Sequence, residues 1–75
     1  MLKEITTVLE QVRRERGMTK AELARRAEMQ QSVIGWIETG RFKPYESQLE
    51  KLAAALDWDG EPHRLMEEVE NEPNA

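Results

Sequence analysis

Apolar residues recur at helical spacing along most of the chain, with Gly or Pro between the stretches. Near the start they are Leu2, Ile5, Val8, Leu9 and Val12. Residues three and four positions apart lie on one face of a helix. This spacing therefore predicts a first helix over about residues 2–16, which Gly17 is placed to end.

A pair of short helices follows. The pattern TKAE at residues 19–22 is a capping box, in which the Thr19 hydroxyl accepts the amide of Glu22 and the Glu22 side chain reaches back. The segment EMQ then predicts a tight turn, and a third helix is expected over about residues 31–39, ended by Gly40. Two helices joined by a turn of about three to four residues form a helix-turn-helix arrangement.

The second half of the chain is also predicted to be helical. Pro44 disfavours helix at the residue before it. A fourth helix is expected over about residues 46–56, and Pro62 suits the first turn of a fifth helix that reaches about residue 70. Their apolar positions are Leu49, Leu52, Ala53, Leu56, Leu65, Met66 and Val69.

These elements predict an all-α fold, a compact bundle of five helices with no strand. A chain of 75 residues is enough for one small domain. We assign residues 1–70 to this domain and residues 71–75 to a frayed carboxyl-terminal tail.

The predicted third helix has two different faces. At about 100° per residue, Val33, Ile34 and Ile37 gather on one side, which should pack on the domain. The opposite side carries four residues without charge: Gln31, Ser32, Gly35 and Trp36. Solvated helix faces usually carry Lys and Glu, whereas Gln and Ser can bond base edges and Gly permits close approach. This face favours entry of the helix into the major groove of DNA. The alternative is that it binds nothing, as is common for weakly polar helix faces, and that Trp36 lies against the neighbouring loop near Phe42.

The charge distribution changes what the net charge of −4 implies. Residues 1–44 hold nine Lys or Arg and six Asp or Glu, a balance of +3, whereas residues 45–75 hold two and nine, a balance of −7. Attraction to DNA depends on the local patch more than on the total. The basic half contains the third helix, so the acidic total does not exclude nucleic acid.

The composition argues against a metal site, an enzyme and a membrane protein. There is no cysteine and a single histidine, His63, which leaves little for a metal site or a catalytic group. We expect no cofactor and no enzymatic activity, because no phosphate-cradling loop or nucleophile–base arrangement is found. No apolar run approaches the ~20 residues of a membrane span, and Lys3 and Glu4 interrupt any signal-peptide pattern. We expect a cytoplasmic protein.

The segments RRERGMTKAELARRAEMQQSVIGWIETGRFKP and LEKLAAAL together resemble the phage-repressor or Cro-like helix-turn-helix regulators, the XRE family. The resemblance runs from about Leu2 to Leu65. It implies a lambda-repressor-like domain of five helices that binds a double-stranded DNA operator, usually as a homodimer, with its third helix in the major groove.

The resemblance also implies roles for particular residues. Gln31, Ser32, Gly35 and Trp36 occupy the base-reading positions. Phosphate contacts are implied for Lys20, Gln30, Arg41 and Lys43, with Gln30 a capping residue as the alternative. Arg13 and Glu38 match a pair that commonly forms a buried salt bridge, so we interpret them as structural. Arg14, Arg16, Arg25 and Arg26 are interpreted mainly as solvated, with some contact to phosphate.

Three positions depart from the family pattern. Lys20 replaces a frequent Gln and can still meet a phosphate. Glu28 replaces the usual Gly of the turn, where a left-handed conformation would cost about 1 kcal/mol. Trp36 replaces a frequent Arg or Lys; its indole can donate to a phosphate or contact a thymine methyl group.

These features predict a small transcriptional regulator, with repression as its expected action. An alternative is an antitoxin-type or purely protein-interaction module that keeps the fold with weak or no DNA binding. Trp58 leaves two interpretations open: it covers the small core, or it joins Leu65, Met66 and Val69 in a dimer contact.

Overall fold

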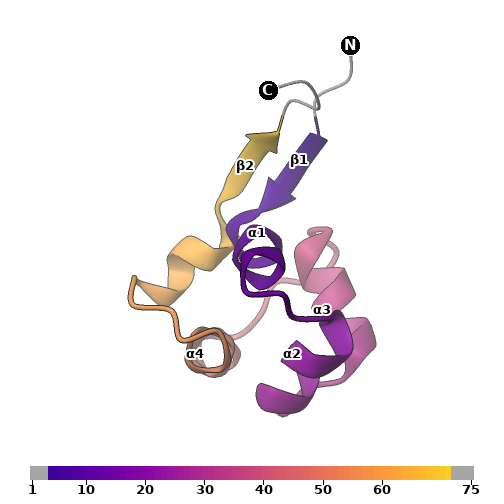
Figure 1. Cartoon of the computed structure of the whole chain (residues 1–75), viewed down its shortest axis with the longest axis vertical. Coiled ribbons are helices and arrows are strands. Elements are labelled where there is room, and N and C mark those ends of the chain that lie inside the picture. The colour runs from indigo at the N-terminus through magenta and orange to yellow at the C-terminus, as the bar shows by residue number, and fades with distance from the viewer. Residues whose placement is uncertain (1–3, 72–75) are drawn as a thin grey trace.

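The computed structural model describes residues 4–71. It is mostly helical, with dimensions of 37 × 23 × 23 Å. In chain order the elements are β1 (Glu4–Thr7), α1 (Val8–Glu15), α2 (Lys20–Arg26), α3 (Gln31–Glu38), α4 (Glu46–Ala55), the 3-10 helix η1 (Pro62–Met66) and β2 (Glu68–Asn71). Figure 1 shows β1 and β2 projecting together from the helical body.

The prediction of a single first helix over residues 2–16 is wrong for residues 4–7, while residues 2 and 3 fall outside the described residues. Residues 4–7 form a strand, and α1 begins only at Val8. The Thr7 hydroxyl accepts the amide of Glu10 at 3.2 Å and so caps α1 at its amino end. β-Branched residues such as Ile and Thr form helix less readily and pair well in strands, which favours this division.

The predicted fifth helix over residues 62–70 and the absence of strands are also wrong. Residues 62–66 form one short 3-10 helix, and β2 pairs antiparallel with β1, Thr6 opposite Val69 and Thr7 opposite Glu68. The described chain therefore holds four α-helices, a 3-10 helix and a two-stranded sheet, not five α-helices. Asn71, assigned to the tail, lies in β2, and residues 72–75 fall outside the described residues.

α3 and α4 agree with their predicted bounds to within one residue, and α2 begins directly after Thr19, as the capping pattern predicts. Thr19 accepts the amide of Glu22 at 3.0 Å, as the capping pattern predicts, but the Glu22 carboxylate binds Arg26 instead of reaching back. α3 ends at Glu38 with Thr39 as its carboxyl cap. α2 packs on α3, and together they form the expected helix-turn-helix (Figure 1).

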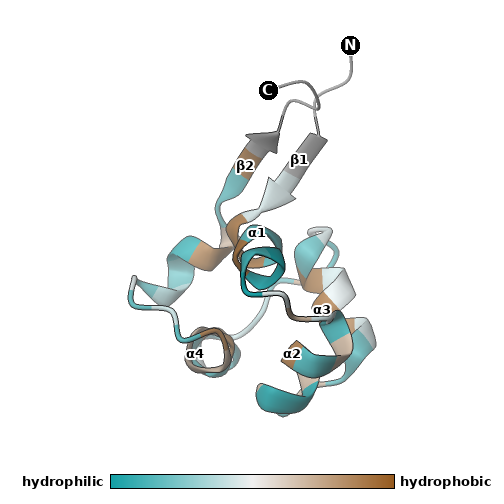
Figure 2. Ribbon diagram, in the orientation of Figure 1, coloured by the Kyte–Doolittle hydropathy of each residue, from teal (hydrophilic) through white to brown (hydrophobic). Residues whose placement is uncertain are grey.

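The hydrophobic core lies between the helices, and every α-helix contributes to it. The largest fully buried side chains are Leu9, Leu23, Ile34, Ile37, Leu52, Leu56 and Leu65. Figure 2 shows hydrophobic residues on parts of α1, α3 and η1 and hydrophilic residues over much of α2. This core holds α3 by its apolar face and leaves the opposite face outside.

Each of the four α-helices ends in the same backbone motif. In every case two amides after the helix bond back to its last turn; after α3, for example, Gly40 N–H bonds the Ile37 carbonyl and Arg41 N–H bonds the Trp36 carbonyl. This Schellman motif needs a left-handed residue just past the helix. Gly17 and Gly40 supply it after α1 and α3, but Glu28 and Asp57 supply it after α2 and α4, with φ of 59° and 55°.

Trp58 packs against the core after α4. Its ring lies so close to Gly60 that a Cβ there would meet a ring carbon at 2.9 Å, and its indole N–H bonds the Glu61 carbonyl at 3.2 Å. Leu65 is fully buried and Met66 is partly buried. In this arrangement Trp58 closes the α4–η1 loop over the core.

Candidate nucleic-acid interface

The connection between α2 and α3 sets the position of the candidate interface. Glu28 adopts the left-handed conformation after α2, and Met29 N–H bonds the Ala24 carbonyl at 2.8 Å. Met29 is half-buried and packs against the core. Gln30 follows in extended conformation as the cap residue of α3. The turn therefore contains the strained conformation that the sequence suggested, together with its acidic side chain.

The two faces of α3 are divided as the helical spacing predicts. Ile34 and Ile37 are 0% and 1% exposed, and Val33 packs against the core. On the other face Gln31 and Ser32 are exposed, Gly35 is half-buried, and Trp36 is 47% exposed. In the described part of the chain, Trp36 and Tyr45 are the large hydrophobic residues that are exposed. The structure thus places the four predicted base-reading residues on one side of one helix.

Gly35 has no role inside the protein that requires a glycine. It lies within α3, and its φ is not among the positive values found in residues 4–71. A Cβ built at this position would meet only the Lys20 Nζ atom, at 3.9 Å, which is an ordinary contact. Glycine in a helix costs about 0.5–1 kcal/mol relative to alanine. Gly35 therefore lowers the stability of α3 slightly, and no packing contact inside the protein requires a glycine at this position.

The residues predicted to contact phosphate lie on α2, directly before α3 and in the loop after α3, and the Lys43 side chain lines a hollow beside the carboxyl end of α3. Lys20 begins α2, Gln30 precedes α3, and Arg41 and Lys43 lie in the loop after α3; all four are exposed. Gln30 makes no side-chain capping bond, so its amide group is available to a ligand. The amides of Arg41 and Phe42 both bond the Trp36 carbonyl, at 2.7 and 3.2 Å, and this pins the loop to the end of α3.

Arg13 and Glu38 form the buried ion pair that the sequence suggested. Arg13 Nε lies 2.7 Å from Glu38 Oε2, and Arg13 donates a further bond to the Met18 carbonyl at 2.8 Å. The side chains are 9% and 1% exposed. The two charged groups therefore neutralise each other inside the fold and hold α3 against α1.

The basic residues of the described chain divide into those that have a carboxylate partner and those that do not. In residues 4–71, carboxylate partners lie within ion-pair distance of Arg13, Arg14, Arg26, Lys51 and Arg64. The same part of the chain supplies no carboxylate partner to five exposed cations: Arg16, Lys20, Arg25, Arg41 and Lys43. Arg16 donates to backbone carbonyls instead, and three of the other four are predicted phosphate contacts. Their charges are therefore available to an anionic ligand.

Arg16 has a structural role that the sequence analysis missed. Its Nε donates to the Leu56 carbonyl and its Nη2 to the Asp57 carbonyl at 3.4 Å. Arginine near a helix carboxyl terminus satisfies carbonyls that lack a partner in the helix. Arg16 thereby joins the end of α1 to the end of α4. No local signal predicts this contact, because the two helix ends are about 40 residues apart.

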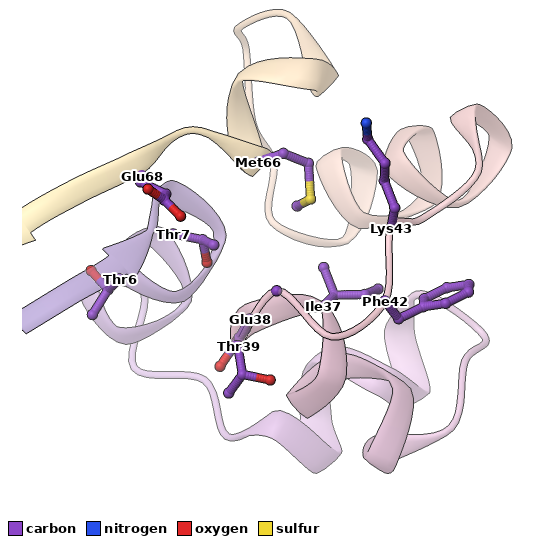
Figure 3. Close-up of a pocket in the computed structure, with 10 residues that line it drawn as sticks. Thr6, Thr7, Ile37, Glu38, Thr39, Phe42, Lys43, Met66 and Glu68 are labelled. Atoms are coloured by element: carbon purple, nitrogen blue, oxygen red, sulfur yellow. The ribbon is translucent and has the colours of Figure 1, made fainter.

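A hollow of about 290 Å³ lies beside the carboxyl end of α3, away from Gln31 and Ser32. Figure 3 shows it between the base of the sheet, η1 and the loop after α3, with Met66 and Ile37 among its lining side chains. Between residues 4 and 71, no group of three or more His, Cys, Asp or Glu could hold a metal ion. No helix in that range is long and apolar enough to cross a membrane.

A family model for the helix-turn-helix domain matches residues 4–66 of the chain. The match covers most of the 75 residues, including both helices of the motif and the core around them. The chain belongs to the helix-turn-helix domain family, a class of DNA-binding domain. Neither a curated protein nor a solved structure matches the chain significantly.

Proposed function

We propose that the protein is a sequence-specific binder of double-stranded DNA and acts as a small transcriptional repressor of the Cro-like, XRE type. α3 would lie in the major groove, with Gln31, Ser32 and Trp36 facing the bases. Gln can bond bidentately to the N6 and N7 atoms of adenine, Ser can bond several bases, and an apolar ring can contact the thymine methyl group. Arg41 and Lys43 would bind the phosphates that flank the groove.

The observation that carries this proposal is the glycine at position 35. The fold tolerates a Cβ there, yet the residue beside the exposed Gln31 and Trp36 is Gly. A missing side chain on the face of a helix lets another surface approach the helix backbone closely. Lys20 beside Gly35 and Arg41 in the loop after α3 are exposed and have no carboxylate partner, which suits a polyanion.

Homodimerisation is part of the proposal. Two copies related by a two-fold axis would present two α3 helices to half-sites about 34 Å apart on one side of the duplex. The operator would then be a palindrome, and the partner in the cell would be cytoplasmic duplex DNA.

The experiment that tests the proposal is selection of binding sites from random duplex DNA at near-physiological salt, with Gln31→Ala in parallel. We expect a two-fold symmetric site to be enriched, and Gln31→Ala to broaden the sequence preference at one position of each half-site. Binding that is equal for all sequences, or absent even at low salt, would contradict the proposal.

A second candidate function is a protein-interaction or antitoxin-type module. It is favoured by the exposure of Trp36 and by Glu28, which places an exposed acidic side chain in the turn before α3. This alternative predicts no salt-dependent affinity for DNA, whereas a DNA-binding protein loses affinity steeply as the salt concentration rises. Titration of labelled duplex at several salt concentrations separates the two.

A further inference from the structure

The side chain of Lys20 reaches from α2 to the exposed face of α3. Lys20 is the first residue of α2, directly after the Thr19 cap, and is exposed. Its Nζ atom lies 3.9 Å from the position that a Cβ of Gly35 would take. Gly35 is one helical turn from Gln31 and so lies on the same stripe of α3. The ammonium group therefore sits beside the surface that carries the candidate base-reading residues.

The charge of Lys20 is not neutralised by the protein. No carboxylate in residues 4–71 pairs with it, whereas Arg26 of the same helix pairs with Glu22 at 3.1 Å. An ammonium group has three hydrogens to donate and cannot accept a hydrogen bond. Any partner for Lys20 on this face must therefore present acceptor atoms.

We propose that Lys20 is a specificity-determining residue that binds the edge of a guanine in the major groove. This inference rests on the proposed function and differs from the phosphate contact that the sequence suggested for Lys20. Gly35 has no side chain that could contact a base. The ammonium group of Lys20, from the neighbouring helix α2, provides a hydrogen-bond donor beside that position. Guanine presents two adjacent acceptors, N7 and O6, in the major groove, and Lys or Arg is the usual partner of that pair.

Base contact and phosphate contact have different signatures. A residue that reads a base changes affinity at one position of the site, whereas a residue that binds phosphate weakens binding to all sequences alike. The test therefore starts from the site selected by the wild-type protein and substitutes each base pair of one half-site in turn. Affinities are measured at fixed salt for the wild type, Lys20→Gln, Lys20→Arg and the control Lys43→Gln.

We expect Lys20→Gln to lose about tenfold or more in affinity for the selected site. The loss should nearly vanish when one particular G·C pair of the half-site is replaced. Lys20→Arg should keep the preference for guanine at that pair, because Arg can bond the same two acceptors. Lys43→Gln should weaken binding to all duplexes by a similar factor. Circular dichroism should show unchanged helix content, since both lysines are exposed.

Two outcomes would overturn the inference. If Lys20→Gln weakens binding equally for every duplex and lowers its salt dependence, Lys20 binds phosphate, and the proposed function stands without this inference. If the wild-type protein selects no sequence at all, the proposed function fails and the inference fails with it.

Discussion

Arg13 and Glu38 are 25 residues apart in the chain and form a two-point contact inside the fold. Arg13 Nε lies 2.7 Å from Glu38 Oε2, and its Nη2 lies 3.3 Å from Glu38 Oε1. Glu38 is the last residue of α3, so the pair joins the end of that helix to α1. The orientation of the candidate interface therefore depends on a buried pair that does not belong to it.

Breaking this pair on one side should strongly destabilise the protein. Glu38→Gln or Arg13→Met leaves the other charged group buried without its partner, which costs about 3–5 kcal/mol. A domain of this size has only a few kcal/mol of stability, so we expect each variant to be largely unfolded at 25 °C. Urea unfolding followed by circular dichroism measures the effect. The double variant Arg13→Met with Glu38→Met should recover much of the loss, and near wild-type stability of both single variants would contradict a structural role.

Replacing the strained left-handed residues with glycine should stabilise the fold. Glu28→Gly and Asp57→Gly remove a conformation that costs a residue with a Cβ about 1 kcal/mol, and we expect each to raise the free energy of unfolding by up to that amount. Asp57→Ala is the matched control, because alanine keeps the strain. A decrease in the urea midpoint of Asp57→Gly would show that the Asp57 side chain contributes more than its backbone costs.

Gly35→Ala should change stability and DNA affinity in opposite directions. Alanine removes the helix cost of glycine, about 0.5–1 kcal/mol, and its methyl group meets no atom closer than 3.9 Å. The same methyl group projects from the face proposed to meet the bases, so affinity for the selected site should fall. Thermal unfolding and titration of the selected duplex give the two readouts. Unchanged affinity in a stabilised variant would show that DNA does not approach α3 at this point.

The loop after α3 should account for part of the salt dependence of DNA binding. Each phosphate contact contributes about one unit to the slope of log affinity against log salt concentration. We therefore expect Arg41→Gln and Lys43→Gln each to lower that slope by about 1 without changing which sequence is preferred. Arg64→Gln is a suitable control, because this residue pairs with Glu67 in the acidic part of the chain. An equal change of slope in the control would indicate a general field effect.

Several parts of the fold follow from local patterns. The capping pattern at Thr19, the apolar spacing of α3 and α4, and the glycine at position 40 are each read within one or two turns of helix, and the structure agrees with their predicted bounds closely. The same patterns identify the exposed face of α3. Local signals succeed here because helix bonds, caps and faces all link residues that are close in the sequence.

A second capping pattern lies at the start of α1. TVLE at residues 7–10 has the same Thr-x-x-Glu pattern as TKAE, and in the structure Thr7 caps α1 as Thr19 caps α2. It indicates a helix start at Val8, where α1 begins. The periodic apolar residues before it favoured a longer helix, because Ile5 fits both a helical and an extended pattern.

Local sequence patterns are enough to predict the helix-turn-helix pair, the two faces of α3 and the basic character of the half that contains them. Three other features are seen only in the folded protein: residues 4–7 and 68–71 pair as strands, Arg16 binds the end of α4, and Lys20 lies beside Gly35. In each case the partners are far apart along the chain. Strand pairing and contacts between helix ends depend on partners that no local pattern encodes, and they form only when the core brings distant segments together.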